Sequence, residues 1–245
     1  MKRALVTGGS GDIGSAICRR LARDGMHVLV HANSRPERAE AVVASICESG
    51  GSAEAVVFDV TDGVQCREVL GALAGEAPIQ VLVNNAGLAV AKPAQDFSDD
   101  DYDLIMDTNL KGAWLCAQAV GRRMIRHGHG GKIVNVASLV ALKPIGQLSL
   151  YGISKAAVAE MSRCLALEWQ RYDIQVNAIC PGYVETEMNA AHWRSEAGKA
   201  LIRRFPAKRL MPVEALDALL LLLASSGSDH MTGAVIPIDE AQSLM

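Results

Sequence analysis

Two side chains that can exchange protons, Tyr151 and Lys155, lie four residues apart in the sequence. If this segment is helical, both project from one face of the helix, one turn apart. A phenol, whose ordinary pKa is about 10, becomes a useful proton donor when a neighbouring ammonium group lowers that pKa. Ser138, at the end of a preceding apolar run, could hold a substrate oxygen or the phenol in place. The three residues indicate acid–base chemistry on a carbonyl or an alcohol, although Tyr and Lys at this spacing are also common on solvated helices.

A glycine-rich turn follows the first short apolar run, residues 3–7. It contains the pattern G-x-G-x-x-G at Gly9, Gly11 and Gly14, just before a helix predicted from about Asp12 to Arg23. Glycines at such a turn let backbone amides approach a pyrophosphate, and the N-terminus of the helix attracts negative charge. The turn therefore indicates dinucleotide binding, and an ordinary strand-to-helix turn is the alternative.

The turn after the second predicted strand, residues 27–31, bears on the choice between NADP and NAD. Proteins that prefer NAD usually place Asp or Glu there, on the ribose 2′-hydroxyl. Here the strand is followed by Asn33, Ser34 and Arg35, with no carboxylate. Arg35 could pair with a 2′-phosphate, and the other two could hydrogen-bond to it. The turn favours NADP(H), with NAD(H) as the alternative, unless Arg35 only begins the next helix.

Strands and helices alternate along the whole sequence, with no linker and no repeat. Further strands are predicted over residues 53–60, 79–83, 132–137, 173–179 and 233–238, and helices over 36–48, 99–126, 151–171 and 211–224. This order predicts a single α/β domain over residues 1–245: a Rossmann fold whose doubly wound parallel sheet has about seven strands, with helices on both faces. Residues 183–206 are mostly irregular, with a helix suggested at 192–204, and are expected to form a mobile lid over the site.

Polar residues interrupt these elements at three places. Asp59 lies near the end of the third strand, where it could contact an adenine amino group or cap the following helix. The small residues and amides of 84–87 follow the fourth strand, where open α/β sheets bind ligands. Asn109 and Gly112 are unfavourable in the middle of the helix predicted over 99–126, which makes that point a candidate kink or site.

Composition excludes several classes of protein. The chain has 245 residues, 50% of them hydrophobic, so it can bury a large core, and its net charge of -3 leaves no basic footprint for nucleic acid. No apolar stretch is long enough for a signal peptide or a membrane span, so a cytoplasmic protein is expected. The six cysteines contain no C-x-x-C pair and are expected to be reduced and mostly buried. The six histidines show no spacing typical of ligands, so no metal site is predicted.

Taken in order, these motifs resemble those of the short-chain dehydrogenase/reductase family over essentially the whole chain. Thr7–Gly14 is similar to the family's turn T-G-x-x-x-G-x-G, Asn84–Gly87 to its N-N-A-G, and Pro181–Thr186 to the segment beside the nicotinamide. The remaining matches are the adenine-contacting acid, Asp59, and the catalytic tetrad, Asn109, Ser138, Tyr151 and Lys155.

The resemblance implies hydride transfer between NADPH and a carbonyl. Tyr151 would protonate the substrate oxygen and Ser138 would orient it. Lys155 would bind the nicotinamide ribose and lower the pKa of Tyr151, while Asn109 would position a water that links Lys155 to solvent. The implied cofactor contacts are Gly8, Ser10, Gly11, Asp12, Ile13, Asn33, Ser34, Arg35, Asp59, Val60, Asn85, Ala86, Gly87, Tyr151, Lys155, Pro181, Gly182, Val184 and Thr186.

Within the family, the segment 181–188 and Val136-Ala137-Ser138 look most like those of bacterial 3-oxoacyl-[acyl-carrier-protein] reductases and acetoacetyl-CoA reductases. This likeness implies 3-oxoacyl thioester substrates, fatty acid biosynthesis, and an acyl carrier protein that contacts Arg126 and Arg171. Both arginines are otherwise solvated helix ends. Other readings are an alcohol, sugar or steroid dehydrogenase of the same family, and a nucleotide-sensing protein without catalysis.

The family also implies a homotetramer, to which the long helices predicted over 99–126 and 150–171 could supply the interface. Two departures from the family pattern stand out. Asp12 replaces a glycine of the cofactor turn, where a carboxylate close to phosphate should weaken binding unless it points away as a helix cap. Residues 238–241 (Ile-Asp-Glu-Ala) lack the Gly-Gly that follows the acid in many relatives, so a different local loop geometry is expected.

Overall fold

Seven parallel strands form one sheet in the order β3-β2-β1-β4-β5-β6-β7. The structure is a computed structural model and describes residues 1–187 and 189–245. The strands are β1 (Arg3–Val6), β2 (His27–Ala32), β3 (Ser52–Val57), β4 (Val81–Asn84), β5 (Gly131–Val136), β6 (Ile174–Pro181) and β7 (Val235–Ile238). Together with the helices on both faces this is the predicted single-domain Rossmann fold, with a doubly wound parallel sheet.

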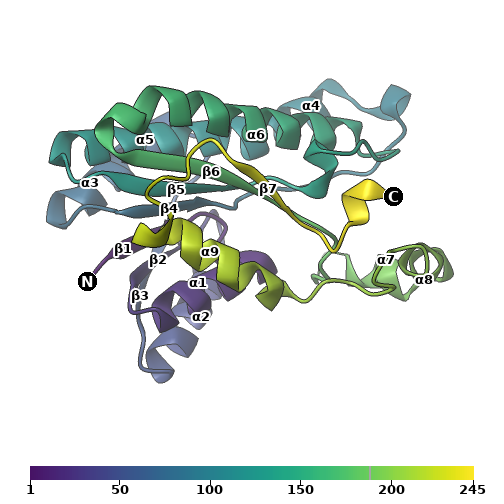
Figure 1. Ribbon diagram of the computed structural model, residues 1–245, viewed down its shortest axis with the longest axis horizontal. Coiled ribbons are helices and arrows are strands. Elements are labelled where there is room, and N and C mark those ends of the chain that lie inside the picture. Colours follow the sequence, from purple (N-terminus) through teal and green to yellow (C-terminus); the bar gives the residue numbers. More distant parts are fainter. Residues whose placement is uncertain (188) are drawn as a thin grey trace.

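Helices cover both faces of the sheet (Figure 1). One layer contains α3 (Gly63–Glu76), α4 (Asp99–Met106), α5 (Gly112–His127) and α6 (Ser149–Trp169). The other contains α1 (Asp12–Arg23), α2 (Pro36–Glu48) and α9 (Asp217–Ala224), and two short helices, α7 (Ala190–Arg194) and α8 (Glu196–Ile202), project to one side. Because β1 pairs with both β2 and β4, the strand order reverses there, and a ligand crevice is expected at the carboxyl ends of these strands.

The core explains why the strands are nearly all apolar. Each strand is covered on both faces, so successive side chains enter opposite cores. Leu5 of β1 packs with Leu29 and Leu82 on one face. Its neighbours Ala4 and Val6 pack in the cluster on the other face. All eight residues of β6 are buried.

Several element boundaries differ from the sequence-based expectation, and three of the differences have a clear physical reason. The helix predicted over 99–126 is two helices, α4 and α5, joined by a π-helical turn at Asp107–Lys111, so the kink predicted at Asn109 is confirmed. The strand predicted over 53–60 ends at Val57, because Asp59 turns the chain by accepting hydrogen bonds from Thr61. The helix predicted over 211–224 is α-helical only from Asp217, after a 3₁₀ turn that begins behind Pro212.

No helix among the described residues is long and apolar enough to cross a membrane. The six cysteines all carry free thiols, four of them buried, whereas Cys47 and Cys164 are exposed. Within the same described part, no three His, Cys, Asp or Glu side chains come close enough together to hold a metal ion.

Candidate active site

The predicted proton-transfer residues meet at the carboxyl end of β5. Ser138 follows that strand directly, and Tyr151 and Lys155 lie in the first turns of α6. The Ser138 hydroxyl lies close enough to the Tyr151 phenol to influence its pKa. The Nζ atom of Lys155 lies 5.9 Å from the centroid of the Tyr151 ring. The helix therefore presents both side chains on one face, as their spacing predicts.

The pKa of Tyr151 differs from the expectation. Burial raises the pKa of this phenol above its ordinary value, and the neighbouring Ser138 hydroxyl offsets part of that rise. The Nζ atom of Lys155 donates a hydrogen bond to the carbonyl oxygen of Val136 at 2.8 Å.

Lys155 itself is 4% exposed, and burial lowers its pKa to about 8. The group that offsets part of this lowering is the nearby thiol of Cys180, whose own pKa burial raises to about 11. The lysine therefore remains mainly protonated at neutral pH, but it holds its proton less tightly than a solvated lysine.

Asn109 sits inside the π-helical turn and ties it to two other segments. Its Oδ1 atom accepts from the backbone N–H of Leu88 at 2.8 Å, and its Nδ2 atom donates to the carbonyl of Leu88 and to Ser154 Oγ, both at 2.9 Å. A Cβ atom on Gly87 would lie 3.1 Å from Asn109 Oδ1 and 3.2 Å from Lys155 Nζ, so a larger residue would disturb both groups.

The glycine turn and the 84–87 segment are held together at the crevice. Thr7 Oγ1 accepts hydrogen bonds from the backbone N–H groups of Asn85 and Ala86, at 3.0 and 3.1 Å. Gly8 adopts a φ of 63°, in the left-handed region, and a Cβ there would lie 2.9 Å from Cα of Ala86. A Cβ on Gly14 would collide with the carbonyl of Gly8, so the close approach of turn and helix requires both glycines.

The N-terminus of α1 fits a pyrophosphate. Gly11 is its N-cap and makes no side-chain capping bond, so the amides of the first turn, from Asp12 onward, have no capping partner from the chain. These amides and the helix dipole offer the positive potential that a dinucleotide phosphate needs. Ser10 and Ile13 flank this turn, and Ile13 also packs against Val184.

His31 was not among the residues expected at the site, yet it connects three cofactor segments. It is the next-to-last residue of β2, is 1% exposed, and its Nδ1 atom accepts a hydrogen bond from the backbone N–H of Gly8 at 2.9 Å. Its Nε2 atom lies 2.8 Å from the carbonyl oxygen of Phe58, just before Asp59, which fixes the neutral form with Nε2 protonated. Burial lowers the pKa of His31 to about 4. Only the paired strand register brings these groups together, so spacing gives no signal for it.

The predicted 2′-phosphate residues lie at the carboxyl edge of β2. Asn33, Ser34 and Arg35 are exposed, and none of the three side chains makes a hydrogen bond within the described residues. Arg35 is also the N-cap position of α2, with Pro36 as the first helical residue. The two expected roles of Arg35 are therefore compatible.

Asp59 does not cap the following helix. Asp62 caps α3 instead, and its Oδ1 atom accepts from the backbone N–H groups of Val64 and Gln65. Asp59 Oδ1 accepts from Thr61, which fixes the carboxylate near the end of β3. Val60 is 4% exposed, so only its backbone remains available to a cofactor.

The segment after β6 is tied to the first turn of α1. Asp12 Oδ2 accepts a hydrogen bond from the backbone N–H of Glu187 at 2.6 Å, so Asp12 points toward the lid and does not cap its own helix. The Glu187 carboxylate pairs with Arg38 of α2, also at 2.6 Å. Thr186 accepts from the backbone of Asn189 at 3.1 Å. This arrangement places 186–187 beside the expected pyrophosphate site.

Pro181 and Gly182 are packed against the C-terminal loop. The Gly182 amide donates to the carbonyl of Ile238 at 2.8 Å, and a Cβ on this glycine would lie 2.7 Å from Gln242 Oε1. The same Gln242 oxygen accepts from the amide of Tyr183 at 2.9 Å. In this loop Glu240 and Ala241 have φ values of 47° and 64°, in the left-handed region that glycine enters most easily.

The proposed lid contains an aromatic cluster. Tyr183 stacks on Phe205 (ring centroids 5.3 Å apart) and packs edge-on against Trp193 (5.0 Å). Burial raises the pKa of the Tyr183 phenol, and the charge of a Tyr151 phenolate would raise it further, so the two phenols are neighbours. Residues 190–194 and 196–202 are helical, and Met188 lies outside the described residues.

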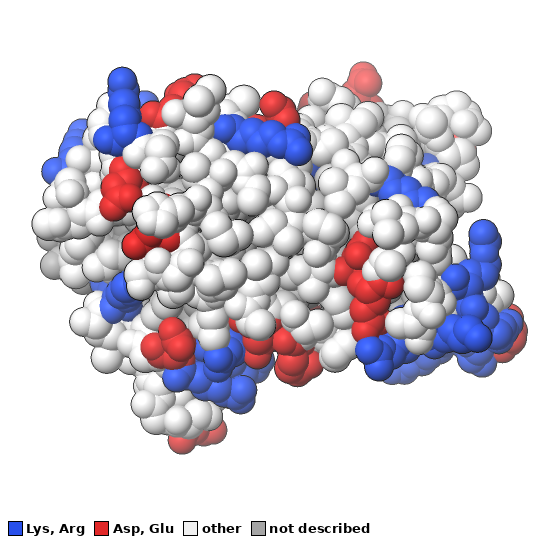
Figure 2. All heavy atoms as spheres, in the orientation of Figure 1, with Lys and Arg blue, Asp and Glu red and all other residues white. Residues whose placement is uncertain are grey.

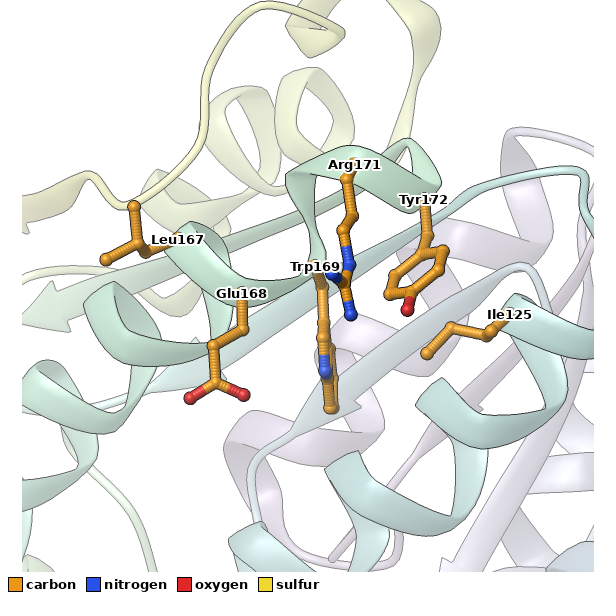
Figure 3. A pocket seen from close by; sticks show the side chains of 6 residues that line it. All are labelled: Ile125, Leu167, Glu168, Trp169, Arg171 and Tyr172. Carbon is orange, nitrogen blue, oxygen red and sulfur yellow. The ribbon is translucent and has the colours of Figure 1, made fainter.

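The best-formed surface hollows lie elsewhere, on the outer face of α5 and α6. Figure 3 shows one of them, with Trp169, Arg171 and Tyr172 around it. The Arg171 guanidinium lies 4.7 Å from the centroid of the Tyr172 ring. From Tyr151 to Trp169 the helix advances about 27 Å, so this hollow is remote from the proton-transfer residues.

Comparisons with known proteins agree with this geometry. The family described as short chain dehydrogenase matches residues 2–197. A galactitol 2-dehydrogenase of Rhizobium johnstonii is 37% identical over 97% of this chain and 93% of its own length. A gluconate 5-dehydrogenase of Gluconobacter oxydans is 34% identical over the same shares.

A solved structure of similar fold is the gluconate 5-dehydrogenase from Burkholderia cenocepacia in complex with NADP and tartrate. It superposes with a TM-score of 0.93 at 34% identity, over 100% of this chain and 96% of that one. The chain therefore belongs to the short chain dehydrogenase family, and it is an oxidoreductase of that family.

Proposed function

We propose that the protein interconverts a secondary hydroxyl of a polyol or sugar acid with the corresponding ketone, using NADP(H). The observation that carries the chemistry is the position of the Ser138 hydroxyl beside the half-buried Tyr151, with Lys155 one turn along the same helix. The substrate class rests on the relatives, which are named for galactitol, gluconate and threitol. They favour the sugar dehydrogenase reading over the 3-oxoacyl thioester reading.

In the oxidative direction, Ser138 holds the substrate hydroxyl while Tyr151 accepts its proton. The bound nicotinamide supplies the hydride acceptor for this step. The protonated Lys155 near Tyr151 stabilises the negative charge that the phenolate carries before it takes up the proton. In the reductive direction the same phenol donates its proton to the carbonyl oxygen.

The expected role of Asn109 needs restating. Its side chain is committed to Leu88 and Ser154, so we propose that it acts by holding this turn rather than by binding the relay water itself. π-Helical turns are rare and often lie at functional sites. The side chain then serves to hold the turn in place.

For the cofactor we propose the contacts named above: the first-turn amides of α1 for the pyrophosphate, and Asn33, Ser34 and Arg35 for the 2′-phosphate. Arg35→Ala should raise the KM for NADPH at least tenfold, because a charge-assisted pair is lost, and should change the KM for NADH little. Equal effects on the two cofactors would mean that the 2′-phosphate is read by another residue.

The test is a panel of substrates followed by NADP⁺ reduction at 340 nm: D-gluconate, galactitol and threitol, with NAD⁺ in parallel. Acetoacetyl-CoA with NADPH, in the reverse direction, tests the thioester reading. Tyr151→Phe is the matched control and should lower turnover a hundredfold or more while NADPH still binds. Turnover of acetoacetyl-CoA alone would restore the reductase reading, in which Arg126 and Arg171 contact an acyl carrier protein. No turnover of any carbonyl or alcohol, with NADPH bound, would leave only a nucleotide-sensing role.

We also propose that the chain assembles into a homotetramer through α5 and α6. Trp114 and Leu167 on these helices are 42% and 85% exposed, an unusual exposure for large apolar side chains that flank a surface hollow. A second copy would cover both by a two-fold contact. Light scattering of wild type and of Leu167→Glu checks this: the variant should shift to smaller species, and a wild-type monomer would contradict it.

A further inference from the structure

The second part of the proposed lid and the residues that follow it carry an excess of positive charge. Residues 190–209 contain six Lys or Arg and one carboxylate, Glu196, whereas residues 183–189 carry two carboxylates, Glu185 and Glu187, and the chain as a whole has a net charge of -3. Figure 2 shows Lys and Arg side chains gathered on the side of the molecule where α7 and α8 project in Figure 1. The imbalance is therefore local and belongs to one segment.

Half of these cations have acidic partners. Lys199 pairs with Glu196 at 2.9 Å, Arg194 with Glu185 at 3.7 Å, and Arg209 donates to Glu240 at 3.1 Å. The other three, Arg203, Arg204 and Lys208, are exposed and form no ion pair within the described residues. These three are called the lid cations below.

The lid cations are attached to the wall of the substrate site. Arg203 and Arg204 directly precede Phe205, which is 1% exposed and stacks on Tyr183. The backbone N–H of Lys208 donates to the carbonyl of Phe205 at 3.0 Å. Tyr183 in turn follows the carboxyl end of β6, beside the strand that delivers Ser138. The lid cations therefore adjoin Phe205, the aromatic residue that stacks on Tyr183, and Tyr183 in turn lies close to Tyr151.

We infer that the lid cations select anionic substrates, so that the hydroxyl oxidised belongs to a sugar acid with a free carboxylate rather than to a neutral polyol. The inference rests on the proposed function and names the substrate class within it. Unpaired cations beside a site raise the local concentration of an anion and its rate of entry, and salt screens the effect over about 8 Å at physiological ionic strength. A neutral polyol would feel neither effect. The relative solved with NADP also holds tartrate, a dicarboxylate.

The test compares an acid with a neutral polyol of the same carbon chain. The kcat/KM values for D-gluconate and D-sorbitol are measured at saturating NADP⁺ between 20 and 300 mM NaCl. Three proteins are used: wild type, Arg203→Gln/Arg204→Gln/Lys208→Gln, and Lys2→Gln/Arg23→Gln/Arg67→Gln. The last removes three exposed cations that lie outside the lid and form no ion pair within the described residues.

For wild type and the second triple variant, we expect kcat/KM for gluconate to fall about fivefold to tenfold as salt increases, while the value for sorbitol stays within twofold. The lid variant should start about fivefold to tenfold lower for gluconate and show no salt dependence. Gluconate and sorbitol that respond equally, or two triple variants that behave alike, would overturn the inference while the proposed function stands.

If neither compound is oxidised, the proposed function is refuted. A binding experiment then tests anion selection separately. Titration calorimetry of the NADP⁺-loaded enzyme compares tartrate with erythritol, which has the same four-carbon chain without charge. Salt-sensitive binding of tartrate that the lid variant loses supports anion selection. Absent tartrate binding, or binding that the lid variant keeps, overturns it. Thermal unfolding of all three proteins confirms that each is folded.

Discussion

The carboxylate of Asp12 accepts a hydrogen bond from the backbone N–H of Glu187 across 2.6 Å, which joins the first turn of α1 to the segment that follows β6. In the proposed cofactor site, a carboxylate at this turn would repel the cofactor phosphates, while its hydrogen bond would hold the lid segment beside them. Two effects of opposite sign therefore act through one residue, and two substitutions separate them.

Asp12→Asn keeps an acceptor for the Glu187 amide and removes the charge, so NADPH should bind about twofold to fivefold more tightly. Asp12→Ala removes both the acceptor and the charge, so the lid segment loses its hydrogen bond to α1. NADPH should then dissociate about twofold to fivefold faster than from Asp12→Asn. These sizes follow from the modest value of exposed charged contacts. Stopped-flow NADPH fluorescence measures both. Identical dissociation rates for Asn and Ala would show that the hydrogen bond to Glu187 does not restrain the cofactor.

Lys155 is a site at which activity and stability should conflict. Its pKa of about 8, against 10.5 for a solvated lysine, corresponds to a cost of about 3 kcal/mol for keeping the charge buried below pH 8. Lys155→Met removes this cost but leaves the Val136 carbonyl without its donor, a penalty of about 1–3 kcal/mol. The variant should therefore be at least as stable as wild type at pH 7 and lose activity a hundredfold or more.

The sign of the pH dependence checks the cause. Between pH 8 and 10.5 the unfolded chain binds more protons at this lysine than the folded chain does, so the stability of wild type should rise with pH in that window relative to Lys155→Met. Urea unfolding of the cofactor-free proteins at pH 7 and 9.5 measures the difference. A gap between the two proteins that stays constant would mean that Lys155 is not desolvated.

A second pH dependence of stability, at acidic pH, is expected from His31. Its pKa of about 4, against 6.5 for a solvated histidine, means that the unfolded chain binds more protons here between pH 6.5 and 4. Wild type should lose about 3 kcal/mol of stability through this residue over that window, since a protonated Nδ1 could no longer accept from Gly8. His31→Gln should lack this component and should bind NADPH more weakly at pH 7.5. Unfolding free energies at pH 7.5 and 4.5 measure it, and equal losses in both proteins would refute it.

Local sequence was sufficient for the elements and for the proton-transfer residues. A spacing of four residues places Tyr151 and Lys155 on one helix face, and polar Asn109 beside Gly112 marks the interruption between α4 and α5. The electrostatics could not be predicted in this way. The hydrogen bond that the Lys155 ammonium group makes depends on the Val136 carbonyl, which belongs to β5.

The same limit applies to contacts between distant segments. His31 reaches Gly8 and Phe58 only because three strands pair in one register, and Glu187 meets Asp12 from 175 residues away. Spacing left open whether Asp59 caps the following helix, and the cap is Asp62, three residues on. Local spacing therefore suggests which residues can cap or bind, whereas tertiary packing decides which of them do.

The loop after β7 offers a prediction about backbone strain. Ala241 has a φ of 64° and follows Glu240 at 47°, although neither is glycine. The left-handed region costs an L-residue with a Cβ roughly 1–2 kcal/mol. Glycine avoids this cost but lowers the unfolding free energy by about 0.5–1 kcal/mol, because it gives the unfolded chain more conformational entropy. Ala241→Gly should therefore raise the unfolding free energy by about 0.5–1 kcal/mol.

The matched control is Ala44→Gly, at an exposed position in the middle of α2, where glycine should lower stability by about 1 kcal/mol. The same substitution thus has opposite signs at two positions, because only the backbone conformation differs. Urea unfolding of both variants beside wild type measures the difference. Destabilisation by both substitutions would contradict the prediction. It would show that the contacts of the Ala241 methyl group outweigh any cost of its left-handed conformation.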